Sequence, residues 1–156
     1  LTGGDMVKTV TRDQATWNDL PWKFEAGTPN VAGGVAAAEA VRFLSSIGMD
    51  TVWKHEQELV TYALPRLKSI PGLTVLGPDD RLGIFSFTMQ GIHSHDLASF
   101  LDERGIAIRG GHHCAQPLLT SLRLADCARA SVGLYTTTDD LDRFIAALSE
   151  AQQILA

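Results

Sequence analysis

The chain has 156 residues, 45% of them hydrophobic and 20% charged, which fits one globular domain or one lobe of a larger protein. Its net charge of −5 argues against a nucleic-acid partner, because nucleic-acid-binding proteins usually carry a basic face. No apolar run approaches the length of a bilayer span and no signal peptide is visible, so no membrane partner is expected.

The first 30 residues contain proline and glycine breaks and show no regular apolar period, so we expect them to form a long loop. A loop of this length is uncommon in a compact domain unless it binds or docks on something. Because the chain also lacks an initiator methionine, we expect a fragment of a longer protein. In this interpretation residues 1–30 connect to a missing large domain, and residues 31–156 form a C-terminal small domain.

Two consecutive helices are predicted next. Asn30 is a suitable N-cap for a helix over 31–47, which is rich in glycine and alanine and stops at Gly48. A second helix over 51–69 has apolar residues on one face at helical spacing. Pro65 lies inside this second helix and is expected to kink or shorten it.

The second half of the chain alternates between strands and helices. Strands are predicted over 73–76, 84–87, 106–108 and 128–134, and the strand over 84–87 is apolar and expected to be buried. One helix is predicted over 95–104 with Ser94 as its cap, and a last helix is predicted after a cap at Thr138. This order predicts an α/β fold, an α+β lobe in which helices pack on a small mixed or antiparallel sheet.

The segment from Arg109 to Cys114, Arg-Gly-Gly-His-His-Cys, is the best candidate for a reactive site. Its glycines allow positive φ and close approach of a ligand. The guanidinium of Arg109 and the imidazoles of His112 and His113 would favour a thiolate, which is the nucleophilic form of cysteine. A turn with a small buried cysteine is the alternative that these residues leave open.

The other cysteine and the histidines have plainer interpretations. Cys127 is expected to be a packed thiol at a strand edge, and two cysteines are too few for a secreted disulfide scaffold, so we expect a reducing, cytoplasmic setting. A zinc site would draw on the candidates His93, His95, His112, His113 and Cys114. Since these residues lack paired ligand spacing, no metal is expected, and His95 is equally explained as a residue of a first helical turn.

Six motifs stand in one order along nearly the whole chain: Gly3-Gly-Asp-Met-Val7, Phe24-Glu-Ala-Gly-Thr-Pro-Asn30, His95-Asp96, Leu101-Asp-Glu-Arg-Gly-Ile-Ala107, Arg109-Gly-Gly-His-His-Cys-Ala-Gln-Pro-Leu118 and Arg129-Ala-Ser131. Together they resemble the C-terminal part of a group II (SUF-type) cysteine desulfurase. These are pyridoxal-phosphate enzymes with the class V aminotransferase fold, a form of fold-type I. The second and fifth motifs are highly specific when they occur together.

The resemblance implies a role for individual residues. In that family a loop cysteine attacks the sulfur of the cofactor-bound substrate, which gives a persulfide and L-alanine and provides sulfur for iron–sulfur cluster assembly. Cys114 holds this position. Arg129 matches the arginine that binds the substrate carboxylate, and Arg109 and His112 are expected beside the substrate.

Three further assignments stay open or depend on the family alone. Gly27 and Thr28 match the residues that reach the cofactor phosphate of the partner subunit in a homodimer. Without the resemblance, an ordinary surface-pairing arginine is the favoured interpretation of Arg129. The sequence also does not decide which of His112 and His113 assists proton transfer and which orients the loop.

The cofactor lysine marks a departure from the family pattern. The family holds pyridoxal phosphate as a Schiff base on a lysine of the large domain, and none of the four lysines here (Lys8, Lys23, Lys54 and Lys68) lies in that motif. The resemblance therefore implies a lobe that is inactive alone and works with an N-terminal large domain, a homodimer mate, L-cysteine and a sulfur-acceptor protein. A non-catalytic thiol or persulfide carrier, or an interaction module, is the alternative.

Overall fold

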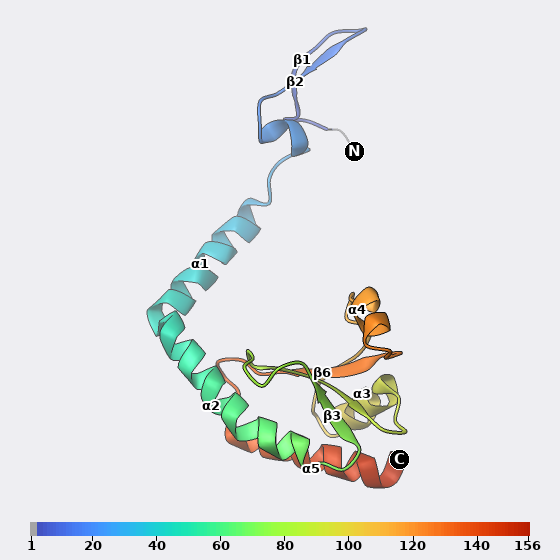
Figure 1. Cartoon of the computed structure of the whole chain (residues 1–156). Helices are drawn as coiled ribbons and strands as arrows, with labels where there is room; N and C mark the ends of the chain where they lie inside the picture. The colour runs from blue at the N-terminus through green and yellow to red at the C-terminus, as the bar shows by residue number, and fades with distance from the viewer. Residues whose placement is uncertain (1–2) are drawn as a thin grey trace. The chain divides into compact units, whose positions relative to one another are not determined.

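The computed structural model describes residues 3–156. The chain divides into two compact units, one ending at Gly48 and the other spanning Met49–Ala156 (Figure 1). The boundary predicted at residue 30 concerns how the chain joins a larger protein, and it stays a prediction.

The first unit is more regular than the loop predicted for its first 30 residues. Strands β1 (Val7–Val10) and β2 (Ala15–Trp17) form an antiparallel hairpin, and the 3₁₀ helix η1 (Trp22–Phe24) follows them. None of the residues in these two strands is buried, so the sequence carries no apolar alternation that would predict them.

Helix α1 (Val31–Ile47) begins and ends where the sequence predicts. The side-chain oxygen of Asn30 accepts a hydrogen bond from the Gly33 N–H at 2.9 Å, and the helix stops at Gly48, whose φ is 88°. None of its residues is buried, and Val35 and Phe43 are among its exposed apolar side chains. Within the first unit, this helix therefore presents an apolar surface.

The second unit contains a four-stranded antiparallel sheet in the order β3-β4-β6-β5, which confirms the predicted type of sheet. Its strands are β3 (Leu73–Leu76), β4 (Ile84–Met89), β6 (Cys127–Ser131) and β5 (Arg109–Gly111). The strand predicted over 106–108 is wrong, because Ile106 and Ile108 pack against the core while only the three residues after them pair with β6.

Helices cover one face of this sheet. Side chains alternate along a strand, so Phe85, Phe87 and Met89 point to the same face of β4. They join a single buried cluster with residues of α2 (Met49–Lys68), α3 (Ser94–Asp102) and α5 (Thr138–Leu155). The expectation that the whole strand is buried was wrong, because Ile84 points to the uncovered face and is 41% exposed.

Two details of the helices also differ from the sequence prediction. Pro65 does not shorten α2, whose last turn is held by the buried side chains of Leu64 and Leu67. The N-cap of α5 is Thr137 and not Thr138, and it forms a capping box with Asp140.

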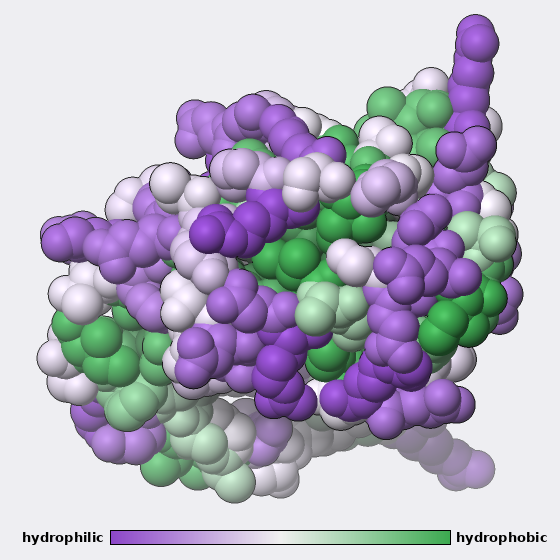
Figure 2. All heavy atoms as spheres, turned by 90° about the horizontal axis from the view of Figure 1, so that it is seen from below, coloured by the Kyte–Doolittle hydropathy of each residue, from purple (hydrophilic) through white to green (hydrophobic). Residues whose placement is uncertain are grey.

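Hydrophilic side chains cover most of the face seen in Figure 2, with apolar side chains visible between them. No single described helix is long and apolar enough to cross a membrane, although α1 and α2 taken together satisfy that test of length and composition.

Candidate active site

Cys114 lies in a tight turn between β5 and the short helix α4 (Gln116–Ser121), so the predicted exit from a strand into a loop is present. The turn has an unusual backbone, because His113 and Cys114 both have positive φ, 54° and 58°. The Cys114 side chain is exposed, which leaves its sulfur accessible to a reactant.

The structure gives the two glycines before the cysteine a packing role. A Cβ at Gly110 would lie 2.6 Å from the carbonyl oxygen of Ser94, and one at Gly111 would lie 3.1 Å from Nε2 of His95. Gly111 also has the predicted positive φ, 114°. The glycines therefore let β5 pack closely on the first turn of α3, a reason that differs from the ligand contact that we predicted.

Ser94 joins the start of α3 to the Cys114 loop. It was expected to cap α3, but His93 is the N-cap, and Nδ1 of His93 accepts from the His95 N–H at 3.2 Å. Ser94 is instead buried, and its hydroxyl accepts a hydrogen bond from the Gly111 N–H at 3.0 Å. No local pattern connects Ser94 with the loop, because 17 positions separate Ser94 from Gly111.

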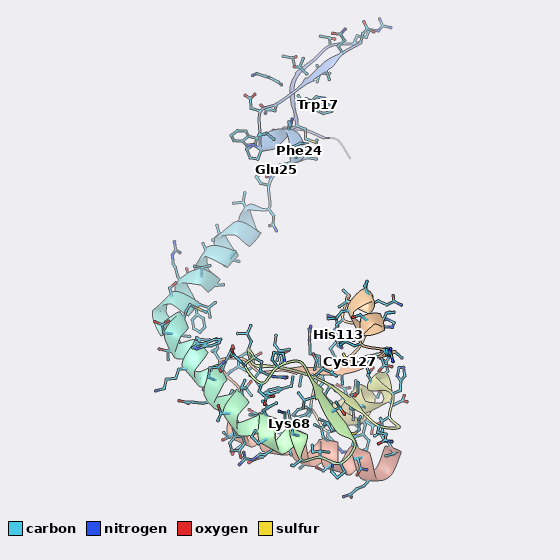
Figure 3. The ribbon with its side chains drawn as sticks, viewed as in Figure 1. Trp17, Phe24, Glu25, Lys68, His113 and Cys127 are labelled. Atoms are coloured by element: carbon cyan, nitrogen blue, oxygen red, sulfur yellow. The ribbon has the colours of Figure 1, made fainter. Side chains whose placement is uncertain are left out.

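The two adjacent histidines have different surroundings. Nε2 of His113 lies 2.8 Å from the carbonyl oxygen of Cys127, and Figure 3 shows these two residues side by side. The side chain of His112 is exposed and makes no hydrogen bond within residues 3–156. His113 therefore attaches the loop to β6, whereas His112 is free to contact a ligand.

A cavity of about 790 Å³ opens beside Cys114. Its lining includes the imidazoles of four histidines, together with a guanidinium, a thiol and a carboxylate: His93, His95, His112, His113, Arg109, Cys114 and Asp126. Three of the predicted site residues, Arg109, His112 and Cys114, thus share one cavity. Within the described part of the chain, no three potential metal ligands are grouped closely enough to hold an ion.

Asp126 is a site residue that the sequence analysis missed. Its carboxylate accepts from the Ser94 N–H at 3.1 Å and lies 3.2 Å from Nε2 of His93. Burial by itself would raise the pKa of Asp126, but the hydrogen bonds from Ser94, with His93 and His95 nearby, lower it below its ordinary value. No local motif marks this residue, so only the fold reveals its place in the cavity.

Arg109 and Arg129 stand directly opposite each other on β5 and β6. Ser86 of β4, which points away from the helices, is in turn the partner of Arg129, so both arginines lie on the uncovered face of the sheet. Neither arginine forms an ion pair with any residue between 3 and 156. Two like charges directly opposite each other repel and destabilise the strand pair. An anion such as a carboxylate, bound between the two guanidinium groups, would neutralise this repulsion.

Arg109 also contacts the candidate nucleophile. Its Nη2 donates to Sγ of Cys114 at 3.6 Å, which is a hydrogen-bonding distance for sulfur. Cys127, in contrast, is buried at 3% exposure, and burial raises the pKa of its thiol. Cys127 is therefore a packed strand thiol, as predicted, and Cys114 is the thiol that faces the cavity.

Gly27 and Thr28 lie in the first unit, just before the N-cap of α1. The Gly27 N–H donates to the carbonyl oxygen of Gly4 at 2.9 Å, so this amide is already engaged. Thr28 is exposed and its hydroxyl has no hydrogen-bond partner in the described chain. The Thr28 hydroxyl and the positive end of α1 therefore have the chemistry to bind a phosphate.

The fold is consistent with fold type I, and the cavity is lined by an exposed thiol, that of Cys114. The family model of class V aminotransferases ("Aminotransferase class-V") matches residues 1–144, and the chain belongs to this family. Among curated relatives, a probable cysteine desulfurase of Halobacterium salinarum is 51% identical over all of this chain. Another from Staphylococcus aureus is 46% identical over 99% of it.

Solved structures agree with this assignment. The cysteine desulfurase CsdA from Escherichia coli matches the whole chain with a TM-score of 0.90 at 36% identity, and the chain covers 39% of it. The apo cysteine desulfurase of Thermococcus onnurineus NA1 matches 98% of the chain with a TM-score of 0.87 at 31% identity, again with 39% covered. The chain also spans 38% of the length of the two curated relatives.

Proposed function

We propose that this chain is the C-terminal lobe of a group II, SUF-type cysteine desulfurase. The enzyme would take sulfur from L-cysteine, release L-alanine and hold the sulfur as a persulfide on Cys114. The observation that carries the proposal is the position of Arg109. It lies on β5 directly opposite Arg129 of the neighbouring strand β6, and it contacts Sγ of Cys114. The similarity to cysteine desulfurases over the whole chain supports the same reaction.

The residues of this chain divide the work between binding and attack. Arg129 and Arg109 bind the substrate carboxylate with charge-assisted hydrogen bonds, and this orients the substrate thiol toward Cys114. The Cys114 sulfur attacks the substrate sulfur, so that an S–S bond forms and the C–S bond breaks. The carbon keeps the bonding electron pair and takes up a proton to become the methyl group of L-alanine, which balances the proton that the Cys114 thiol gives up.

Pyridoxal phosphate, when bound, supplies the electron sink that makes the C–S bond cleavable. We place its lysine in an N-terminal large domain, since none of the four lysines of this chain lines the Cys114 cavity. Thr28, with Gly27 beside it, would reach the cofactor phosphate of a homodimer mate. The exposed apolar surface of α1 supports such packing against a large domain or a second subunit.

The fate of the sulfur follows from the exposure of Cys114. A persulfide at this position stays accessible to a sulfur-acceptor protein, which would deliver the sulfur to iron–sulfur cluster assembly. We propose the reducing cytoplasm as the place of the reaction.

The test of the proposal is Cys114→Ala in the enzyme completed by its large domain. We expect no bound sulfane sulfur after incubation with L-cysteine, while the absorbance of the bound cofactor is retained. Cys127→Ala is the matched control and should still form the persulfide, because Cys127 is buried away from the cavity. Undiminished bound sulfur on the Cys114 variant would overturn the proposal.

A second experiment tests whether the lobe needs the large domain. The chain alone is titrated with pyridoxal phosphate, reduced with borohydride and analysed by mass spectrometry. We expect no stoichiometric adduct on any of its lysines. A stoichiometric adduct on one lysine would show that the chain holds the cofactor by itself, against the division that we propose.

A further inference from the structure

The Cys114 loop is held by a side chain of its own, that of His113. We propose that His113 is a positioning residue, which fixes the nucleophile loop in its left-handed conformation by a hydrogen bond to β6. This inference rests on the proposed function of Cys114, and it adds a role that the adjacent pair of histidines does not reveal in the sequence.

The contacts of His113 determine where its proton lies. Nε2 lies 2.8 Å from the carbonyl oxygen of Cys127, which can only accept, so Nε2 carries the hydrogen. Nδ1 is buried and has no hydrogen-bond partner within the described chain. The N–H at Nε2 is therefore the donor that attaches the ring to β6.

The backbone of the loop shows why such an attachment is needed. His113 and Cys114 are consecutive residues with φ of 54° and 58°, a left-handed backbone conformation that residues other than glycine rarely adopt. Such a conformation persists only when the surrounding contacts hold it. Before the turn, the Gly111 N–H donates to Ser94, and after it the Ala115 N–H donates to the carbonyl oxygen of His112 at 2.9 Å.

Between these two bonds, the His113 ring ties the centre of the turn to β6. It connects the loop to the residue at which β6 begins, Cys127. This attachment keeps Sγ of Cys114 within 3.6 Å of Nη2 of Arg109, which itself is fixed on β5. The geometry of the nucleophile thus depends on a bond made by its neighbour.

A pair of variants separates the hydrogen bond from the bulk of the ring. His113→Gln keeps an N–H donor near the position of Nε2, and His113→Leu keeps a similar volume without a donor. In the 156-residue chain, hydrogen exchange of peptides covering 109–116 should be about tenfold faster in the leucine variant, as expected for one lost hydrogen bond, and should return to the original rate with glutamine. Exchange across β4 should stay the same in all three proteins.

The same variants are then assayed for persulfide formation in the enzyme completed by its large domain. We expect kcat to fall about tenfold for His113→Leu with KM for L-cysteine unchanged, and glutamine to restore kcat, because a single hydrogen bond is lost and regained. If the unaltered enzyme forms no persulfide, the proposed function fails. If it does, the positioning role is overturned by a leucine variant with unchanged loop exchange and kcat, by a glutamine variant that restores neither, or by faster exchange across β4 as well.

Discussion

The guanidinium of Arg109 donates from Nη2 to Sγ of Cys114 across 3.6 Å. On its strand, Arg109 is also the direct partner of Arg129. Arg109 therefore connects the thiol with the second arginine, and in the proposed function it would take part in both substrate binding and sulfur attack. Within the described residues, Arg129 makes no hydrogen bond to the thiol and does not line the cavity beside it.

This difference predicts distinct kinetic effects for the two arginines. Arg129→Ala in the completed enzyme should raise KM for L-cysteine, because one charge-assisted contact with the carboxylate, worth about 1.5–3 kcal/mol, is lost. The expected change in KM is roughly ten- to a hundredfold, with a smaller effect on kcat. Steady-state kinetics of alanine formation measure both constants, and an unchanged KM would return Arg129 to a structural role.

Arg109→Ala serves as the comparison for Arg129→Ala. It should raise KM in the same way and in addition lower kcat, because the hydrogen bond to Sγ of Cys114 is lost. Equal kinetic profiles for the two variants would contradict the double role of Arg109.

The sequence predicted the parts of this molecule that have a local signal. The Asn30 cap and the Gly48 stop define α1, and the order of elements indicated a small mixed or antiparallel sheet with packed helices, which is antiparallel in the structure. The hairpin of the first unit was missed because its strands are exposed and lack alternation. Strand β5 was misplaced, since Ile106 and Ile108 carry the apolar signal while the pairing residues are polar or glycine.

The same distinction applies to the candidate site. Cys114, Arg109 and His112 were found because they occur in one short motif, and they do share a cavity. Asp126 and Ser94 were missed as site residues because their importance comes from contacts between distant parts of the chain. The different surroundings of His112 and His113 likewise depend on β6, which begins 14 residues after His113 and is not visible in the motif.

Gly110→Ala tests the close packing of β5 on α3. An added Cβ would lie 2.6 Å from the carbonyl oxygen of Ser94, so the strand or the helix must move. We expect the free energy of unfolding of the second unit to fall by about 1–3 kcal/mol, measured by urea denaturation. Gly34→Ala is the control, since a Cβ there meets no other atom within 4 Å, and it should cause no such loss.

Thiol labelling tests the different burial of the two cysteines. Iodoacetamide at neutral pH should modify Cys114 in the folded chain and leave Cys127 unmodified, because Cys127 is 3% exposed and burial raises the pKa of its thiol. Both cysteines should react once the chain is unfolded in urea. Peptide mass spectrometry identifies the modified residue, and rapid labelling of Cys127 in the folded state would contradict its burial.

Asp126 predicts a dependence of stability on pH. Burial raises the pKa of Asp126, but the hydrogen bonds from Ser94 together with the nearby His93 and His95 outweigh this effect, so the pKa is lower in the folded chain than in the unfolded one. Its contribution to stability is therefore present above the unfolded pKa of about 3.9 and is lost as the pH falls through the lower folded value. Asp126→Asn should reduce this loss of stability at acid pH. Urea denaturation at a series of pH values between about 2 and 6, a range that includes the unfolded pKa, measures the difference. An unchanged pH profile would count against the hydrogen-bonded carboxylate.

The opposed arginines have a consequence for the sheet itself. Strand β5 has three residues and lies at the edge of the sheet, and the charge of Arg109 faces a like charge on the strand beside it. An anion bound between the two guanidinium groups relieves this repulsion, and a ligand that binds the folded form stabilises it. In the proposed function, the substrate carboxylate would then link β5 and β6. The loop that carries Cys114 would therefore be most rigid when the substrate is bound.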